Sequence, residues 1–342
     1  MAKLTYAKAG VDVNKAKKVQ GSIAGMLEST LNPSVLLGAG HYSGLMRFNG
    51  KILALHCDGV GTKVLIAQQL RKYDTVGIDC VAMNVNDLAC VGAKPVALVD
   101  YLAVEKADEK QISEIMKGLV AGAKEADCAI IGGETAIIPE LIKGIEGRGF
   151  DLSATCAGQI ETEEKIITGE KIGSKDVIVG LASSGLHSDG YTLARKAIIK
   201  GGLGKDKKTL NELLVPTKIY SPIVLELIQN FEIHGLAHIT GGAFSKLQRI
   251  GAPSKKGFIL DSLPKPQKIF GTIQESAGIS EKEMHRTFNM GIGFCIVCSE
   301  EEAENAVSFC RKKGTEARIV GRILADSSDV ILEKNGKRIT LT

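Results

Sequence analysis

The chain of 342 residues is long enough for two ordinary domains with buried cores. Apolar residues make up 44% and charged residues 24%, which is typical of a globular protein, whereas Trp is absent and aromatic residues reach only 4%. This composition argues against the aromatic platforms that bind single-stranded nucleic acid. The net charge of +4 is spread along the chain, and no apolar run approaches the roughly 20 residues that span a bilayer.

The first residues, MAKLTYAKAGVD, lack the apolar core of a signal peptide, so we expect a cytoplasmic protein. Eight cysteines fall mostly inside apolar segments, which predicts buried thiols in a reducing compartment. Cys295 and Cys298 form a CxxC pair within a predicted strand. Residues three apart on a strand point to opposite faces, so a zinc site is not expected there.

Taken in chain order, the first 50 residues are mixed and expected to be partly flexible, with a helix over 15–30 and a glycine loop after it. In the rest of the first half, strands alternate with helices. It is predicted to contain strands at 52–56, 96–104, 128–135 and 151–160 and helices at 62–73, 75–91 and 108–126. Asp108 is a plausible N-cap of the last helix, and the strand at 128–135 is expected to end in a glycine turn.

The second half begins after the charged stretch ETEEKIITGEKIGSKD, so we place a domain boundary near residue 165. It is predicted to contain strands at 176–184, 290–298, 318–323 and 329–341 and helices at 190–199, near Pro222 and after 238–244. Strands and helices alternate without a strict βαβ repeat. The pattern predicts an α+β fold of two domains, 1–165 and 166–342, each a mixed sheet with packed helices.

The loop DGVGTK at 58–63 joins an apolar run to a helical one. Its glycines let backbone N–H groups approach an anion, and a lysine can supply a point charge to a phosphate. An aspartate cannot bind phosphate directly, but it can hold Mg²⁺ that bridges to phosphate oxygens. A hairpin turn with two solvated charges explains the loop equally well.

Two further carboxylates lie near glycine-rich segments. Asp87 interrupts the apolar run NVNDLACVGAKP, and Glu134 follows the two glycines of IIGGETA. A buried carboxylate is costly unless it is paired or binds a metal. A capping or hydrogen-bonded Asp is the alternative for Asp87. Together with Asp58, these residues predict a Mg²⁺ site, because Mg²⁺ binds a few carboxylates together with waters and phosphate oxygens.

The second half places polar side chains in loops of the same kind. His187 lies in LASSGLHSDGYTL and is a candidate for proton transfer near neutral pH. HITGGAF offers a second His at a glycine turn, and Arg286 precedes a strand, where it can hold a phosphate. A surface histidine and a surface salt bridge are the alternatives. No GxSxG or HExxH motif is present, so the protein is not expected to supply a nucleophile.

Read together and in order, these motifs resemble those of the phosphoribosylformylglycinamidine cyclo-ligase family, also called aminoimidazole ribonucleotide synthetase. The segments that carry the resemblance are YAKAGVD, DGVGTK, VAMNVNDLACVGAKP, DYLA, GGETA, DLSATCAG, SSGLHSDGY, PTKIY, HITGGAF and RTFNMGIG. They span nearly the whole chain. The stretch from Asp87 to Pro95 is shared with a wider superfamily of ATP-using enzymes.

The resemblance implies an ATP-dependent ring closure in purine biosynthesis. Formylglycinamidine ribonucleotide would yield aminoimidazole ribonucleotide, ADP and phosphate through an iminophosphate. It also implies Mg²⁺, a monovalent-cation requirement, and a homodimer in which the N-terminal domains pair. Neither nucleic acid nor a membrane is an expected partner.

The resemblance also assigns residues. The implied catalytic residues are His187, Asp87 and Lys63. The implied metal ligands are Asp58, Asp87 and Glu134. The implied nucleotide contacts are Asp58, Gly59, Gly61, Thr62, Lys63, Gly132, Gly133 and Thr135. The implied substrate contacts are Ser184, Gly185, His187, Gly241, Gly242, Arg286 and Asn289. His56, Cys57 and the segment after GGETA depart from the usual pattern of the family.

Relatives within the superfamily are the alternatives. A selenophosphate synthetase is expected to carry a reactive cysteine in its N-terminal segment, and residues 1–40 have none. A formylglycinamidine ribonucleotide synthetase is expected to be longer. A non-catalytic maturation partner is expected to end in a functional cysteine, whereas this sequence ends KRITLT.

Overall fold

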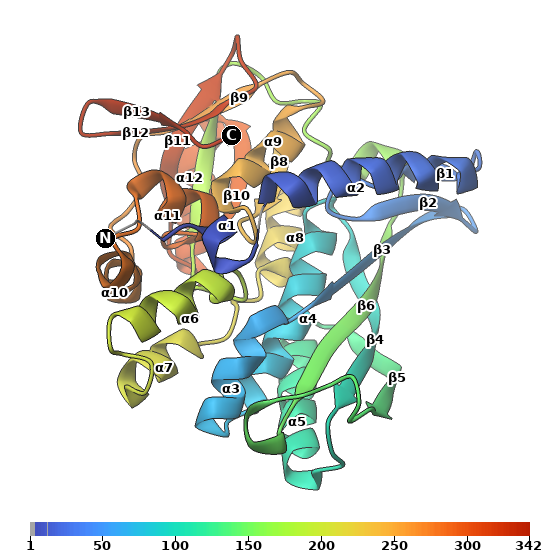
Figure 1. The fold of residues 1–342 in the computed structure, drawn as a ribbon. Coiled ribbons are helices and arrows are strands. Elements are labelled where there is room, and N and C mark those ends of the chain that lie inside the picture. The colour runs from blue at the N-terminus through green and yellow to red at the C-terminus, as the bar shows by residue number, and fades with distance from the viewer. Residues whose placement is uncertain (1–3, 12) are drawn as a thin grey trace.

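The computed structural model describes residues 4–11 and 13–342, and it shows two mixed sheets with packed helices (Figure 1). The first sheet has the strand order β1-β2-β3-β6-β4-β5, and the second has the order β13-β12-β9-β11-β7-β10-β8. Antiparallel and parallel pairs occur in both sheets. The predicted α+β architecture is therefore confirmed. The connection between the sheets, 161–175, includes the predicted domain boundary near residue 165.

The N-terminal half supplies the first sheet. Its strands are β1 (Val35–Leu37), β2 (Gly44–Phe48), β3 (Lys51–Gly59), β4 (Lys94–Val104), β5 (Ala129–Ile137) and β6 (Phe150–Ile160). Its helices are α1 (Tyr6–Ala9), α2 (Val13–Leu27), α3 (Val64–Leu70), α4 (Asp74–Ala89) and α5 (Glu109–Glu125). Four short 3₁₀ turns accompany them: η1 (Glu28–Thr30), η2 (Gly61–Lys63), η3 (Ile145–Gly147) and η4 (Glu163–Lys165).

The C-terminal half supplies the second sheet. Its strands are β7 (Asp176–Ala182), β8 (Ile233–His238), β9 (Gly257–Leu260), β10 (Ile292–Ser299), β11 (Ala317–Leu324), β12 (Val330–Lys334) and β13 (Lys337–Thr340). Its helices are α6 (Tyr191–Lys200), α7 (Lys207–Leu213), α8 (Ser221–Asn230), η5 (Ala243–Lys246), α9 (Leu247–Gly251), α10 (Lys268–Ala277), α11 (Glu281–Thr287) and α12 (Glu300–Lys312).

Helices α4 and α5 pack unusually closely. Gly118 of α5 lies against Asp74, because a Cβ at position 118 would stand only 1.8 Å from the Asp74 carbonyl oxygen. Any larger residue would push the two helices apart. The start of α5 is fixed by the predicted N-cap, since the Asp108 side chain accepts a hydrogen bond from the Gln111 amide at 3.1 Å. This prediction is confirmed.

Strand β5 differs from its prediction. The sequence predicted a strand at 128–135 that ends in a glycine turn, but β5 continues through Gly132 and Gly133 to Ile137 without a turn. Gly133 pairs with Asp100 of β4, and a Cβ at Gly133 would stand 2.4 Å from the Asp100 carboxylate. The glycine therefore makes room for a neighbouring side chain within a strand, which a single sequence does not distinguish from a turn.

The first sheet is covered by helices on one face only. Burial alternates along β6, as expected for a strand with one solvated face. Among the side chains on the open face, Leu55, Val99 and Tyr101 are 40–44% exposed. Ile131 on the edge strand β5 is 71% exposed. An apolar open face of this kind is typical of an interaction surface.

The second sheet is more deeply enclosed. Strand β10, next to the edge strand β8, lies between β7 and β8 and is buried along nearly its whole length. Cys295 and Cys298 are buried within it as free thiols, in line with the sequence analysis. Of the eight cysteines, Cys57 is the exposed one. In the part of the chain that the structure describes, no helix is long and apolar enough to span a membrane.

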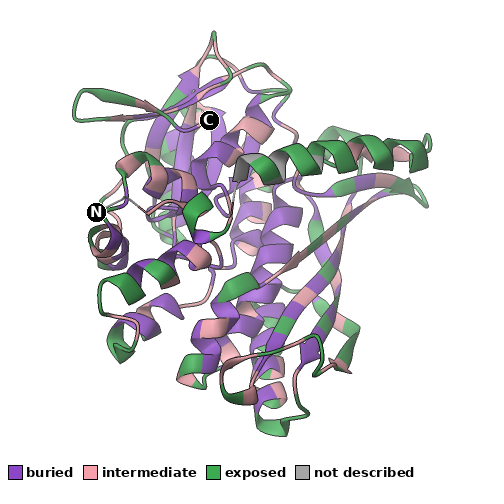
Figure 2. Ribbon diagram, in the orientation of Figure 1, coloured by how far each residue is buried: buried purple, intermediate pink, exposed green. Residues whose placement is uncertain are grey.

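Helix α4 joins the two halves. Figure 2 shows it buried along almost its entire length, between the first sheet and the C-terminal elements. It contacts β3, β4 and β6 on one side and α8 and β8 on the other. Polar residues are nonetheless frequent on it, with Asp79, Asn84, Asn86 and Asp87 all buried. Their partners define the site described next.

Candidate active site

The two asparagines of α4 each fix a segment in a different half of the molecule. The Asn84 side chain accepts a hydrogen bond from the Asp58 amide at 3.1 Å and donates to the Asp58 carbonyl at 3.2 Å. The side-chain Oδ1 of Asn86 accepts from the amides of Tyr220 and Ser221 at 2.7 and 3.2 Å. Asn86 therefore caps the start of α8, while Asn84 anchors the end of β3.

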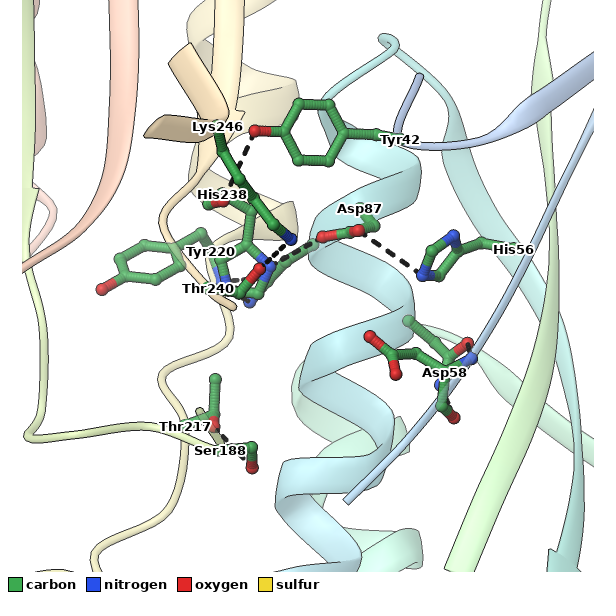
Figure 3. A network of polar contacts seen from close by, with 12 residues as sticks. Tyr42, His56, Asp58, Asp87, Ser188, Thr217, Tyr220, His238, Thr240 and Lys246 are labelled. Carbon is green, nitrogen blue, oxygen red and sulfur yellow. Dashed lines mark hydrogen bonds and ion pairs between the residues drawn. The ribbon is translucent and has the colours of Figure 1, made fainter. Parts of the chain in front are cut away.

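Asp87 is paired with two histidines, as Figure 3 shows. His238, at the end of β8, donates from Nδ1 to Asp87 Oδ1 at 2.8 Å, and His56 Nε2 on β3 lies 3.5 Å from Asp87 Oδ2. Burial raises the pKa of Asp87, but the hydrogen bond from His238 and the charges of Lys246 and His56 outweigh it, and the pKa falls to about 2. Asp87 is therefore an ionised, buried carboxylate.

Asp58 faces the same interior space as Asp87. Its carboxylate accepts from the Gly59 amide at 2.7 Å. Burial, followed by the negative charge of Asp87, raises the pKa of Asp58 above its usual range. Each carboxylate thus disfavours the charge of the other, and a cation between them would stabilise both.

A third carboxylate, Asp189, was not singled out from the sequence although it lies in the quoted motif SSGLHSDGY. Its Oδ2 is buried without a hydrogen-bond partner among the described residues. Burial raises the pKa of Asp189 to about 7, with Lys246 opposing and Asp58 and Asp87 adding to the shift. Gly241 packs closely beside it, since a Cβ there would stand 2.7 Å from Asp189 Oδ1 and the carboxylate would have to shift.

Lys246 is the cation near these carboxylates. It ends η5, after the glycine turn of HITGGAF, and its ammonium donates to the Thr240 hydroxyl. The ammonium also lies 5.7 Å from the centroid of the Tyr42 ring. Its charge lowers the pKa of Asp58, Asp87 and Asp189. The sequence indicated the turn but not this lysine.

Lys63, a predicted phosphate contact, lies inside the protein in this structure. Its ammonium is fully buried and contacts Asp79 at 2.8 Å, the His187 carbonyl at 2.9 Å and the Val215 carbonyl at 2.6 Å. Asp79 also accepts from the Thr217 amide at 2.7 Å. These contacts use the three donors of the ammonium, so in this structure Lys63 links the two halves.

His187 is completely buried in a strained backbone conformation, with φ of +67°. Its Nε2 accepts a hydrogen bond from the Ser184 amide at 3.3 Å, and its Nδ1 has no partner among the described residues. Burial lowers the pKa of His187 well below its usual value. The imidazole is therefore neutral, with the proton on Nδ1, and it presents an unused N–H donor.

Glu134 does not join the other two predicted metal ligands within one chain. Across the sheet, Asp58 pairs with Ala154, Ala154 with Asp100, and Asp100 with Gly133. Glu134 is one residue further along β5, so it points to the opposite face, three strands from β3. Gly132, Gly133, Glu134 and Thr135 are all exposed on this edge strand.

The remaining predicted contacts are distributed around the C-terminal loops. Asn289 Oδ1 accepts from the Ser183 hydroxyl at 3.0 Å and its Nδ2 donates to the Gly185 carbonyl at 2.8 Å, so it fixes the loop that carries His187. The Ser184 hydroxyl donates to the Pro216 carbonyl at 2.6 Å.

Three further residues were predicted to contact substrate or nucleotide. Arg286 lies on α11 and is partly exposed. Thr62 is exposed and its hydroxyl lies 3.2 Å from that of Thr192 across the junction. Gly242 adopts φ of +87°, which suits glycine at the turn before η5.

The arrangement suits a metal–nucleotide better than a metal alone. Among residues 4–11 and 13–342, no group of three or more His, Cys, Asp or Glu side chains is placed to hold an ion without other ligands. Asp58 and Asp87 nevertheless face each other's charge, and the buried Asp189 oxygen lacks a partner. Two carboxylates together with phosphate oxygens and waters form a usual environment for Mg²⁺.

The chain is similar to known proteins over nearly its whole length. Residues 40–160 match the family model "AIR synthase related protein, N-terminal domain" and residues 173–333 match its C-terminal counterpart. The chain is 46% identical to the phosphoribosylformylglycinamidine cyclo-ligase of Pyrococcus horikoshii, over 97% of this chain and 99% of the relative. It is 50% identical to that of Saccharolobus solfataricus, over 86% of each.

Solved structures share the fold at low identity. One is hydrogenase maturation protein HypE in complex with ATP, with a TM-score of 0.63 and 18% identity, covering 97% of this chain and 95% of the other. Another is AaThiL complexed with AMPPCP and TMP, with a TM-score of 0.67 and 13% identity, covering 94% and 96%. Both similarities extend over the two halves of the chain.

Proposed function

The chain belongs to the AIR synthase related family, and from that premise we propose that it closes the imidazole ring of formylglycinamidine ribonucleotide at the expense of ATP. The products are 5-aminoimidazole ribonucleotide, ADP and phosphate. The observation that carries the proposal is the meeting of Asp58, Asp87 and His238 at the junction of the two halves. Relatives with the name phosphoribosylformylglycinamidine cyclo-ligase are 46% and 50% identical to the chain.

The chemistry proceeds in two steps. The formyl amide oxygen attacks the γ-phosphorus of ATP, and ADP leaves. The amidine-side nitrogen then attacks the carbon that carries the phosphorylated oxygen, the C–O bond breaks, and phosphate and a proton leave. Mg²⁺ bound by Asp58 and Asp87 would spread the negative charge of the transferred phosphoryl group. A monovalent cation and a cytoplasmic location remain part of this proposal.

The residues of the chain position the reacting groups. Asp87 holds His238 with Nδ1 protonated, and Asn86 Nδ2 lies 3.4 Å from His238 Nε2, so this ring is fixed at both nitrogens. The N–H of His187 is a donor rather than a base in the neutral tautomer. We therefore assign His187 to binding an acceptor atom of the substrate rather than to removing its proton.

An assay of ring closure tests the function directly. Purified protein is given formylglycinamidine ribonucleotide, ATP and Mg²⁺, and the aminoimidazole product and ADP are measured together. Equal formation of both is expected. ATP turnover without the aminoimidazole product would instead indicate a relative with another acceptor.

The assay needs two variants. Asp87→Asn is expected to lose activity, whereas Asp127→Asn is a matched control, because Asp127 is exposed and its left-handed backbone suits Asn. Equal loss in both variants would mean that the effect does not come from the site.

We further propose that two copies pair through the open face of the first sheet. The support is the group of exposed apolar side chains Leu55, Val99, Tyr101 and Ile131. Tyr101→Asp is expected to convert a dimer to a monomer in sedimentation equilibrium. Ile199→Asp is the matched control, because Ile199 is 63% exposed on α6 in the other half. A wild-type monomer at all concentrations would reject this arrangement.

A further inference from the structure

The burial of Lys63 leaves open which cation meets the transferred phosphoryl group. Its ammonium is held by Asp79 and two backbone carbonyls and lies inside the protein. The site itself is lined by Asp58, Asp87 and Asp189, whose charges repel a triphosphate. An anionic substrate therefore needs a positive group from the protein as well as a metal ion.

Lys246 lies where such a group is needed. In Figure 3 the Lys246 side chain points toward Thr240, beside His238 and Asp87. Its electrostatic influence reaches all three carboxylates, which come from three separate elements of the fold. Lys246 is thus a positive charge at the point where segments from both halves converge.

The local structure holds this lysine in place. The turn before it contains Gly242 and Ala243 in left-handed conformations, with φ of +87° and +45°. The Ser245 hydroxyl donates to the Gly242 carbonyl at 2.7 Å and stabilises the turn. The Lys246 ammonium bonds to the Thr240 hydroxyl and lies over the Tyr42 ring. The hydroxyl uses one of the three N–H donors and the ring uses none in a conventional hydrogen bond, so the ammonium can still donate to an anion.

We propose that Lys246 is a catalytic residue whose ammonium contacts the phosphoryl group as it passes from ATP to the formyl amide oxygen. The assignment rests on the proposed function. In the absence of substrate, Lys246 balances the charge of the carboxylates. When metal and nucleotide occupy the site, the phosphoryl oxygens would contact the ammonium directly. Stabilisation of charge that develops during the transfer lowers the barrier more than it strengthens ground-state binding.

Two substitutions test the assignment. Lys246→Met keeps the length of the side chain and removes the charge, and kcat is expected to fall about 100-fold with less than about a threefold change in KM for ATP. Lys246→Arg keeps the charge and is expected to retain at least about a tenth of kcat. Lys200→Met, at the exposed end of α6, is the control and is expected to match wild type.

The measurements separate this inference from the proposed function. Wild-type protein that forms no aminoimidazole product would reject the function itself. An active wild type with an unchanged kcat in Lys246→Met, and only a lower Mg²⁺ requirement, would overturn the catalytic assignment and leave charge balance as the role of Lys246. Thermal unfolding of each variant with and without AMPPCP shows whether a lost kcat reflects loss of folding. A folded Lys246→Met that still binds the analogue but has lost kcat supports the proposal.

Discussion

Helix α4 carries two buried aspartates, about two turns apart, whose surroundings differ. Asp79 is held by Lys63 and by the amide and hydroxyl of Thr217, all within 3.0 Å. Asp87 is held by His238. Near it, Asp189 Oδ2 and His187 Nδ1 have no hydrogen-bond partner among the described residues. The first region is closed by its own contacts, and the second still offers donors and acceptors.

This difference separates stability from function along one helix. A buried ion pair with few unmet hydrogen bonds gains nothing from a ligand. A buried carboxylate cluster with unpartnered atoms is stabilised by whatever cation or polar group completes it. The comparison predicts that changes near Asp79 act on folding and changes near Asp87 act on catalysis, and the following four experiments test it in order of expected effect.

The largest effect is expected from Lys63→Met. It leaves Asp79 buried without its cation, so the free energy of unfolding should fall by about 3–5 kcal/mol. Chemical denaturation measures this loss. The double variant with Asp79→Asn should recover part of it, because the uncompensated charge is then gone. A loss below about 1 kcal/mol would mean that the pair does not hold the two halves together.

Asp87→Asn should act mainly on catalysis. Removing the carboxylate that orients His238 and faces Asp58 should lower kcat at least about 100-fold, equivalent to about 2.7 kcal/mol. Its unfolding free energy should change much less than that of Lys63→Met. Steady-state kinetics and denaturation on the same preparation check both parts. The reverse result, an unchanged kcat with a large loss of unfolding free energy, would remove the distinction between the two regions.

Asp189→Asn should change the pH dependence of stability. The pKa of Asp189 in the folded protein is raised to about 7, so its contribution to stability is complete below its ordinary value near 4 and is lost as pH rises through 7. The variant should therefore gain about 1–3 kcal/mol relative to wild type between pH 4 and pH 8. Denaturation with EDTA present measures the gain, and Asp127→Asn should show none.

The smallest effect is expected from His187→Asn. The Asn amide can replace the N–H at Nδ1, and Asn tolerates the left-handed backbone at this position. If His187 is a donor, kcat should stay within about tenfold of wild type, whereas His187→Leu should lose more. A complete loss in His187→Asn with normal folding would favour a proton-transfer role instead.

Local signals predicted the elements well. The cap at Asp108 and the alternation of strands and helices identified most of the fold, and the ordered motifs indicated the family, which the relatives confirm. The glycines of β5 were misleading because their cause is the neighbouring Asp100, and that contact depends on strand register. The spacing of residues along one strand does not reveal which strand pairs with it.

The site was only partly predictable for a related reason. Asp58 and Asp87 were predicted, but the role of each residue in the run NVND depends on which half of the molecule it faces. Lys63 lies beside glycines in the sequence, yet its partner Asp79 is on a different element. Lys246 and Asp189 each look like ordinary surface charges in the sequence. Their importance comes from the tertiary arrangement that brings them to the same space.

The capping of α8 by Asn86 has a consequence for how the protein is assembled. A helix in the second half begins on a side chain from the first, and Lys63 donates to carbonyls on the far side of the same junction. Neither half can complete its own hydrogen bonds when produced alone. Calorimetry should therefore find one cooperative transition, and separately expressed halves should aggregate unless they are refolded together.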